Sequence, residues 1–185
     1  MVCGTGPRER GRAAVHEGRA EAAEAATAED LPLKYLLDTN ACIALINGPR
    51  HGPTSGPIGG TIQGEPSGVR LRFEKELEGG AEMFVPSIAA YELWYGVAKS
   101  GRPEKNAKRV QTFFAGPVSL LPFEDGDAQA AGKVRAALEA AGKPIGAYDV
   151  LIAGQAVRHK LTLFTSNQRE FSRVKGLLWE DWGRE

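Results

Sequence analysis

Short apolar runs alternate with helical segments along most of this chain, and this alternation constrains the fold more than any other feature of the sequence. Each run is three to six residues long, the length of a buried strand, and the stretches between runs begin and end with typical helix-capping residues. The runs are Tyr35–Leu37, Met83–Pro86, Val118–Phe123, Leu161–Thr165 and Leu177–Trp179. Strands separated by helices predict an α/β domain with a parallel sheet of four or five strands, covered by helices on both faces.

The helical stretches are expected to fill the gaps between the runs. Ser87 is a suitable N-cap for the helix after the second run, and Asp125 or Asp127 for the long helix after the third. The expected helices are Ala41–Asn47, Val69–Glu78, Ile88–Ser100, Pro103 to about Gly116, the long helix that finishes at Gly142, and Tyr148–Lys160.

Two regions depart from this pattern. Residues 1–33 are rich in Arg, Glu and Ala and offer almost no apolar face, so we expect a disordered tail. Residues 49–69 contain four Pro and six Gly, far above the average share of ~12%, and we expect a flexible surface insertion. One domain is therefore expected over residues 34–185, interrupted by this insertion.

Composition excludes several classes of protein. The 185 residues suffice for one domain with a real core, and Lys plus Arg equal Asp plus Glu, so the formal net charge is zero. A polycation that binds nucleic acid over its whole surface is excluded, and any RNA contact must come from a local patch. No apolar run approaches the ~20 residues that span a bilayer, and the N-terminal segment lacks the apolar core of a secretory signal. Cys3 and Cys42 belong to no paired metal motif, so we expect free thiols and a cytoplasmic protein.

The first candidate site follows the first apolar run. Asp38 and Thr39 stand where the strand is expected to end and a helix to begin. Open parallel sheets bind ligands at the carboxyl ends of their strands, so an acid here lies where such a sheet places its ligand. The simpler alternative is that Asp38 only caps the helix.

A second acid stands alone on an apolar helix. Glu92 is the single charge in the ten residues from Ala89 to Ala98. A helix that is apolar nearly all round is buried, and a buried lone carboxylate is costly unless it is paired, protonated or bound to a cation. The alternative is a Glu92 side chain that reaches solvent at the edge of the apolar stripe.

A third acid, Asp149, falls in the first turn of the apolar helix that follows the chain break at Pro144 and Gly146. Acids are common in a first turn because the helix dipole favours them, so this position alone is weak support for a site. Together with Asp38 and Glu92, it supplies a third acid at the start or on the inward face of an element.

The fourth run ends in Thr165, Ser166 and Asn167, much as the first ends in Asp38. If the two strands are neighbours, Thr165 and Asn167 face the same pocket, and Glu170 is close enough in sequence to reach it. A simple polar turn is the alternative, above all for Ser166.

Three carboxylates that share one pocket need a partner. At an intermediate dielectric each pair repels by roughly 3–4 kcal/mol, so a proton or a cation must relieve the charge. Carboxylate, hydroxyl and amide oxygens suit Mg²⁺ or Mn²⁺ rather than zinc. Such an ion makes a bound water a better nucleophile and neutralises charge on a phosphate, so metal-assisted phosphodiester hydrolysis is the expected chemistry.

Other chemistries find little support in the sequence. None of the three histidines, His16, His51 and His159, is spaced with a Cys, a Glu or a second His for zinc, and His159 is expected at a solvated helix end. The sequence also has no Gly-x-Ser-x-Gly elbow and no Walker-type phosphate loop.

Four segments resemble, in the same order, the motifs of PIN-domain endoribonucleases, and specifically those of the toxins of VapBC-type toxin–antitoxin pairs. The resemblance extends from Lys34 to Trp182, but residues 1–33 and the insertion are not typical of the family. The segments are Tyr35–Asn40 (Tyr-Leu-Leu-Asp-Thr-Asn), Tyr91–Gly96 (Tyr-Glu-Leu-Trp-Tyr-Gly), Pro144–Ala153 (Pro-Ile-Gly-Ala-Tyr-Asp-Val-Leu-Ile-Ala) and Leu163–Asn167 (Leu-Phe-Thr-Ser-Asn), the last followed by Glu170-Phe171 and Arg173-Val174.

The resemblance implies a Mg²⁺ or Mn²⁺ site in which Asp38, Glu92 and Asp149 bind the metal, with Asp38 and Asp149 as direct ligands. Asn167 stands where many family members carry a fourth acid and others an asparagine, which leaves a second metal site open. The two threonines are implied to orient water or the scissile phosphate. The implied catalytic set is Asp38, Thr39, Glu92, Asp149, Thr165 and Asn167.

The resemblance also implies partners: structured RNA, often tRNA, as the substrate, a cognate antitoxin, and a second copy in a homodimer, without a membrane. Trp94 and Tyr95 are expected to pack in the core, with a dimer or antitoxin surface as the alternative. Candidate RNA contacts, unless they are only a solvated face, are Lys99, Arg102, Lys105, Lys108 and Arg109 on one helix pair, and Arg169, Arg173 and Lys175 after the fourth strand.

Three other functions remain open at this point. A housekeeping PIN nuclease without an antitoxin has the same fold, and the gene for a small DNA-binding antitoxin next to this one would distinguish the two. A signalling receiver domain also gathers acids around Mg²⁺, but it needs an acidic pair just ahead of its phosphoacceptor strand and a lysine after a late strand. Residues 31–37 hold no acid, and Thr165–Asn167 holds no lysine. A scaffold without activity is disfavoured because all three acids are present.

Overall fold

The structure, a computed structural model, describes residues 32–48 and 68–183. The predicted tail, up to Leu31, and almost all of the predicted insertion lie outside these ranges. Gly68, which we assigned to the insertion, instead begins the helix that was expected to start at Val69. Leu33 accepts a backbone hydrogen bond from Glu82, so the ordered pairing of the sheet begins before the first strand.

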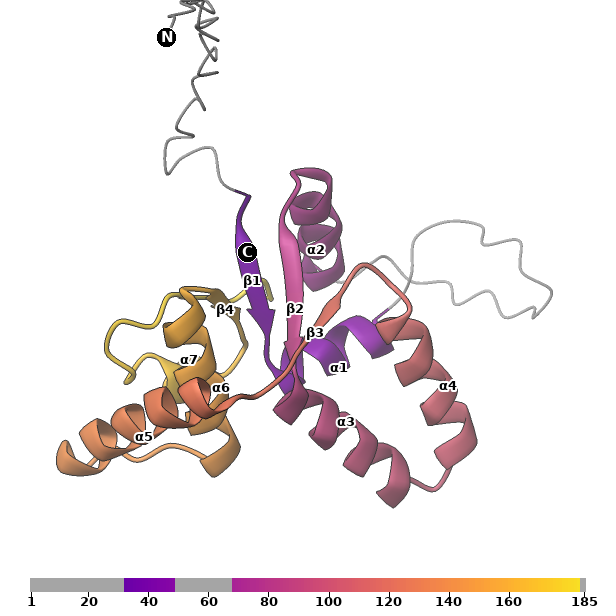
Figure 1. The fold of residues 1–185 in the computed structure, drawn as a ribbon. Helices are drawn as coiled ribbons and strands as arrows, with labels where there is room; N and C mark the ends of the chain where they lie inside the picture. The colour runs from indigo at the N-terminus through magenta and orange to yellow at the C-terminus, as the bar shows by residue number, and fades with distance from the viewer. Residues whose placement is uncertain (1–31, 49–67, 184–185) are drawn as a thin grey trace, which may run out of the picture. The chain divides into compact units, whose positions relative to one another are not determined.

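Five parallel strands form one sheet in the order β3-β2-β1-β4-β5 (Figure 1). All five were expected from the apolar runs, although most are shorter than those runs because the flanking residues turn away into loops. The strands are β1 (Lys34–Leu37), β2 (Glu82–Pro86), β3 (Ser119–Leu121), β4 (Thr162–Phe164) and β5 (Trp179–Glu180).

Seven helices connect the strands. They are α1 (Thr39–Asn47), α2 (Gly68–Glu78), α3 (Ser87–Lys99), α4 (Pro103–Phe114), α5 (Asp125–Ala140), α6 (Ala147–His159) and α7 (Gln168–Phe171). The first six agree with the sequence prediction to within a few residues. Helix α7 has only four residues and carries no periodicity from which it could be predicted.

The connections explain how the helices divide between the two faces of the sheet. Steps from β1 to β2 and β3 move in one direction, and steps to β4 and β5 move in the other, so right-handed crossovers place α1–α4 and α5–α7 on opposite faces. In Figure 1, α1, α3 and α4 lie to the right of the strands, and α5, α6 and α7 to the left.

The core lies between the sheet and these helices. Tyr35, Leu36 and Leu37 of β1 are almost completely buried because β1 is the central strand. Near the end of the described chain, Trp182 stacks on Phe164 with ring centroids 4.0 Å apart and meets Tyr35 edge-on at 5.0 Å. The C-terminal segment is thereby packed onto the strands that carry the candidate site.

Two predicted helix caps were wrong. Ser87 lies inside α3, whose N-cap is Pro86, and its hydroxyl instead accepts a hydrogen bond from the backbone of Phe123 at 3.1 Å. Helix α5 is capped by Glu124, with Asp127 bonding back to the Glu124 backbone N–H in a capping box. Within the described ranges, no helix is long and apolar enough to cross a membrane.

Candidate active site at the ends of two central strands

The candidate site lies where the strand order of the sheet changes direction. Strand β1 lies between β2 and β4, and the chain steps from β1 first to one side and later to the other. Such a switch point opens a crevice at the carboxyl ends of the strands. Asp38 directly follows β1 and Thr165 directly follows β4, so both side chains are delivered to this crevice.

Asp38 is buried and uses both carboxylate oxygens. One accepts a hydrogen bond from the backbone N–H of Ala41 at 2.6 Å and caps α1, and the other accepts the hydroxyl of Thr165 at 2.5 Å. Asp38 therefore caps α1, as the simpler interpretation predicted, but it does more than cap, because its other oxygen faces the end of β4.

A chain of hydrogen bonds leads from Thr165 to the third acid. The Thr165 hydroxyl accepts the backbone N–H of Asn167 at 2.9 Å. The Asn167 amide group in turn donates to Asp149 at 3.2 Å. Asp38, Thr165, Asn167 and Asp149, which are far apart in sequence, thus lie along one connected path.

Glu92 reaches the crevice from α3. Its side chain is half-buried and accepts a hydrogen bond from the hydroxyl of Thr39, the first residue of α1. Glu92 was expected to need a partner if buried or to reach solvent at the edge of the helix; it is half-buried and Thr39 supplies a donor.

Glu170 and Gly146 belong to the site although neither was among the predicted site residues. Glu170 was expected only to lie close enough in sequence to reach the pocket. Glu170 accepts the backbone N–H of Gly146 at 2.9 Å and is hydrogen-bonded to Asp149. A Cβ at Gly146 would lie 3.2 Å from a carboxylate oxygen of Asp149, so glycine leaves room for the acid pair. The available signal was the position of Glu170 three residues after Asn167, one turn further along a helix.

The acids interact strongly enough to change one another's protonation. Burial raises the pKa of Asp38 to about 6, with a smaller contribution from the charge of Glu92, against the opposing effect of the hydrogen bonds from Thr165 and Ala41. Burial, the hydrogen bond to Glu170 and the charges of Glu170, Asp38 and Glu92 raise the pKa of Asp149 to about 7. The Gly146 N–H and the bond to Asp149 lower the pKa of Glu170, so a proton shared by this pair resides on Asp149. The side chains therefore form one electrostatic unit.

The oxygen atoms of the candidate site suit a divalent ion. They belong to carboxylates, hydroxyls and one amide, the ligands that Mg²⁺ and Mn²⁺ prefer. Among the described residues, no three His, Cys, Asp or Glu side chains converge closely enough to hold one ion by themselves. Mg²⁺ usually keeps several waters and binds through one or two carboxylates, so the arrangement fits a partly hydrated ion and not a closed cage of protein ligands.

The prediction for Trp94 and Tyr95 was wrong. They were expected in the core but are 40% and 55% exposed, because α3 presents only its opposite side to the sheet. His159 lies at the exposed end of α6 as predicted. Its ring nitrogen Nε2 is 3.0 Å from the buried carboxylate of Asp127, which Arg158 also contacts at 3.0 Å. This cluster joins α5 to α6 and lies apart from the acids.

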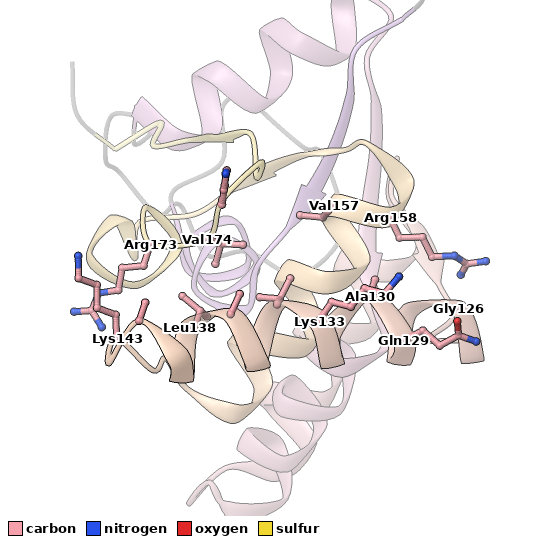
Figure 2. A pocket seen from close by; sticks show the side chains of 14 residues that line it. Gly126, Gln129, Ala130, Lys133, Leu138, Lys143, Val157, Arg158, Arg173 and Val174 are labelled. Carbon is pink, nitrogen blue, oxygen red and sulfur yellow. The ribbon is translucent and has the colours of Figure 1, made fainter.

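A separate cavity of about 770 Å³ lies along α5 and includes none of the site acids (Figure 2). Its floor is aliphatic, with Val134, Leu138, Val157 and Val174, and no acidic side chain lines it. Two of the candidate RNA contacts, Arg173 and Lys175, line the cavity together with Lys133, Lys143 and Arg158.

Comparison with known sequences gives a consistent result. The model of the PIN domain family matches residues 62–177. The tRNA(fMet)-specific endonuclease VapC of Shigella flexneri is 37% identical over 150 residues, which cover 81% of this chain and 98% of that protein. The enzyme of the same name from Salmonella typhimurium is 39% identical over 154 residues, again 81% of this chain and 98% of that protein.

Solved structures agree with the sequence matches. The VapBC2 complex of Rickettsia felis, bound to a DNA fragment from its promoter, contains a chain that is 30% identical with a TM-score of 0.66, over 81% of this chain and 99% of that one. DNA-bound VapBC from Salmonella typhimurium contains a chain that is 36% identical with a TM-score of 0.65, over 81% and 98%. From its fold, its motifs and these relatives, this chain belongs to the PIN-domain family and, within it, to the VapC ribonucleases.

Proposed function

We propose that this VapC ribonuclease is a toxin that hydrolyses a phosphodiester bond of structured RNA, with tRNA(fMet) as the first candidate substrate. Two relatives that are 37% and 39% identical are tRNA(fMet)-specific endonucleases, which supports this substrate. The observation that carries the proposed chemistry is the linked set of acids, in which Asp38 at the end of β1 and Asp149 on α6 meet through Thr165 and Asn167.

The proposed metal ligands are Asp38 and Asp149, with Glu92 as the third acid near the ion. A bound divalent ion supplies an activated water and neutralises charge on the phosphate. The raised pKa values of Asp38 and Asp149 support a cation here, because a buried and a half-buried acid close to other acids, with no cation nearby, hold protons more readily.

The uncharged residues of the set position the acids. Thr165 holds one oxygen of Asp38, Asn167 holds one oxygen of Asp149, and Thr39 holds Glu92. These bonds restrict the rotamers of the carboxylates before substrate arrives, which lowers the entropic cost of ordering them. The hydroxyls of Thr39 and Thr165, which contact Glu92 and Asp38, are also proposed to orient water or the scissile phosphate.

The proposal includes protein partners. Three solved relatives above 25% identity are VapBC complexes, which supports a cognate antitoxin for this chain. The same relatives disfavour a housekeeping RNA-processing nuclease without an antitoxin. A homodimer is part of the proposal, and light scattering of the purified protein tests it through the measured mass.

The test is cleavage of tRNA(fMet) in vitro by the purified protein and by Asp38→Asn, with Mg²⁺ or Mn²⁺ present. Asparagine keeps the size and the capping oxygen of Asp38 but removes the charge. We expect a loss of at least about 100-fold in rate, the size of effect that follows loss of a group acting on the reacting centre.

The matched control is Asp125→Asn, which alters an exposed acid at the start of α5, outside the site. This variant is expected to cleave at the wild-type rate. Wild-type-like cleavage by Asp38→Asn, with a far-UV spectrum that shows folded protein, would refute the proposed chemistry.

A further inference from the structure

Three tyrosines form an exposed aromatic surface on α3 and at the start of α6. Tyr91 and Tyr95 lie one turn apart on α3, and Tyr148 belongs to the first turn of α6. Their side chains are 53%, 55% and 44% exposed, an unusual amount of open aromatic surface for side chains that bury readily. We call these three residues the tyrosine surface.

The rings of the tyrosine surface hold one another in place. Tyr91 and Tyr95 are nearly parallel, at 17°, with centroids 6.4 Å apart, and Tyr148 meets Tyr91 at 68° and 5.7 Å. A hydrogen bond between the side chains of Tyr91 and Tyr148 is the main cause of a raised pKa of Tyr148. The ammonium group of Lys99 lies 5.8 Å from the centroid of the Tyr95 ring. The surface is therefore partly preorganised and carries a cation at one end.

The tyrosine surface borders the candidate active site. Tyr91 immediately precedes Glu92, and Tyr148 immediately precedes Asp149. The negative charge of Glu92 is one of the causes of the raised pKa of Tyr148, so Glu92 lies close enough to the tyrosine surface to interact with it electrostatically. A ligand whose reacting bond lies at the acids thus has these rings within reach of its adjoining atoms.

We propose that the tyrosine surface stacks with unpaired bases next to the scissile bond of the RNA substrate. This inference rests on the proposed function and assigns the three tyrosines a positioning role beside the proposed metal ligands. Exposed aromatic rings stack with bases of any sequence, and a nearby lysine adds a contact to phosphate.

RNA is the occupant that the proposed reaction requires at this surface. It has to approach Glu92 and Asp149 in order to be cut, so its bases meet the rings without blocking the reaction. A protein that covered Tyr91 and Tyr148 would also cover these acids and prevent cleavage, so such a partner would compete with RNA for the surface.

The test measures binding of a fluorescein-labelled single-stranded RNA of mixed sequence, in EDTA so that the RNA is not cut. Tyr91→Leu and Tyr148→Leu remove a ring, whereas Tyr91→Phe and Tyr148→Phe keep it. We expect each leucine variant to weaken binding by about 5-fold to about 100-fold, the range for loss of one stacked base, and each phenylalanine variant to bind within about 2-fold of wild type.

Leu71→Ala is the control. Leu71 is an exposed apolar side chain on α2, outside both the tyrosine surface and the candidate site. Its loss is expected to leave RNA binding within about 2-fold of wild type. The same labelled RNA annealed to its complement is expected to bind less tightly than the single strand, because its bases are already stacked.

Unchanged RNA binding by both leucine variants would overturn the inference, as would wild-type protein that binds no single-stranded RNA. A change in molecular mass by light scattering, with RNA affinity unchanged, would assign the surface to a protein interface and also overturn it. Wild-type protein that binds the RNA through the tyrosines but cuts no RNA in Mg²⁺ would contradict the proposed function and leave the stacking surface supported.

Discussion

Asp38 has two structural tasks that usually fall to different residues. Its carboxylate caps α1 through Ala41 and accepts the Thr165 hydroxyl from the neighbouring strand. Burial raises its pKa to about 6, which means that its charge is costly in the folded protein. Functional sites with buried charges often lower the stability of the folded protein. This loss can be measured as a change in the thermal denaturation midpoint.

The first prediction concerns pH and stability without divalent ions. The folded-state pKa values of Asp38 and Asp149, about 6 and about 7, lie above the value of ~3.9 for an unfolded aspartate. The folded protein therefore binds more protons than the unfolded chain between about pH 4 and pH 7, and its stability falls as pH rises through that window. Thermal denaturation in EDTA is expected to give a lower midpoint at pH 7.5 than at pH 5.

Two further samples identify the groups responsible. Addition of Mn²⁺ at pH 7.5 is expected to restore part of the stability, because the ion binds the ionised acids of the folded state. Asp38→Asn is expected to reduce the decline between pH 5 and pH 7.5. A decline of the same size in wild type and Asp38→Asn would show that other groups cause it. Asp127 has the opposite dependence: despite its burial, the Glu124 N–H, Arg158 and His159 lower its pKa, so its contribution disappears only in stronger acid.

Residue identity alone was enough to predict which side chains meet, but not how they are supported. Asp38 and Thr165 end two apolar runs, so their meeting followed once the strands were taken as neighbours. The bond from Gly146 to Glu170 depends on the shape of the loop before α6, for which the sequence offers only a Pro and a Gly. Such contacts form only when distant segments meet in the folded chain, so they leave little periodic pattern in the sequence.

At the scale of elements, the contact between α5 and α6 is among the closest in the domain. A Cβ at Gly154 on α6 would lie 2.5 Å from the backbone nitrogen of Ala131 on α5, with the Cα of Ala131 closer still. These are backbone atoms that no rotamer change can move. Since α6 carries Asp149, the depth at which α6 packs on α5 also affects the position of the site.

Gly154→Ala is expected to destabilise the protein, because the two helices must separate to accommodate a methyl group. We expect a loss of about 1–3 kcal/mol in the free energy of unfolding, the usual cost of overpacking. Gly132→Ala on α5 is the matched control, because a Cβ there meets nothing within 4 Å. It is expected to gain about 0.5–1 kcal/mol from helix propensity. Urea denaturation measures both, and equal effects in the two variants would contradict the close packing.

Element boundaries were the part of the fold that the sequence predicted least well. Ser87 looked like an N-cap, yet the helix already includes it because Pro86 ends the strand and begins the turn. Helix α3 looked buried all round because ten residues hold one charge, yet Tyr91, Trp94 and Tyr95 face solvent. Apolar composition does not distinguish a buried helix face from an exposed aromatic one, since both read as hydrophobic.

At the scale of the whole domain, topology explains why the acids meet. The order β3-β2-β1-β4-β5 puts the first and fourth strands side by side, and their carboxyl ends carry Asp38 and Thr165. Alternation of strands and helices predicted the parallel sheet, but many strand orders satisfy that pattern. The strand order was therefore not predicted from the sequence and comes from the structure.

The domain also presents positive charge away from the acids, in the cavity along α5 (Figure 2). If the lysines that line this cavity contact RNA phosphates, the double variant Lys133→Ala with Lys143→Ala is expected to lower the slope of log affinity against log salt. The expected decrease is about 0.7–0.9 for each phosphate that a lysine no longer neutralises. Lys75→Ala on α2, an exposed lysine outside the cavity, serves as the control and is expected to keep the slope. Binding titrations with tRNA at several salt concentrations measure this, and an unchanged slope in the double variant would exclude the cavity from RNA binding.

The most direct test of the account is calorimetric titration of Mn²⁺ into wild type, Asp38→Asn and Asp149→Asn. If both acids serve one ion, wild type binds Mn²⁺ and each variant alone loses at least about 10-fold in affinity, as expected for loss of a ligand. Asp125→Asn keeps the wild-type affinity. Wild-type protein that binds no Mn²⁺, or two aspartate variants that bind it as tightly as wild type, would contradict a shared metal site.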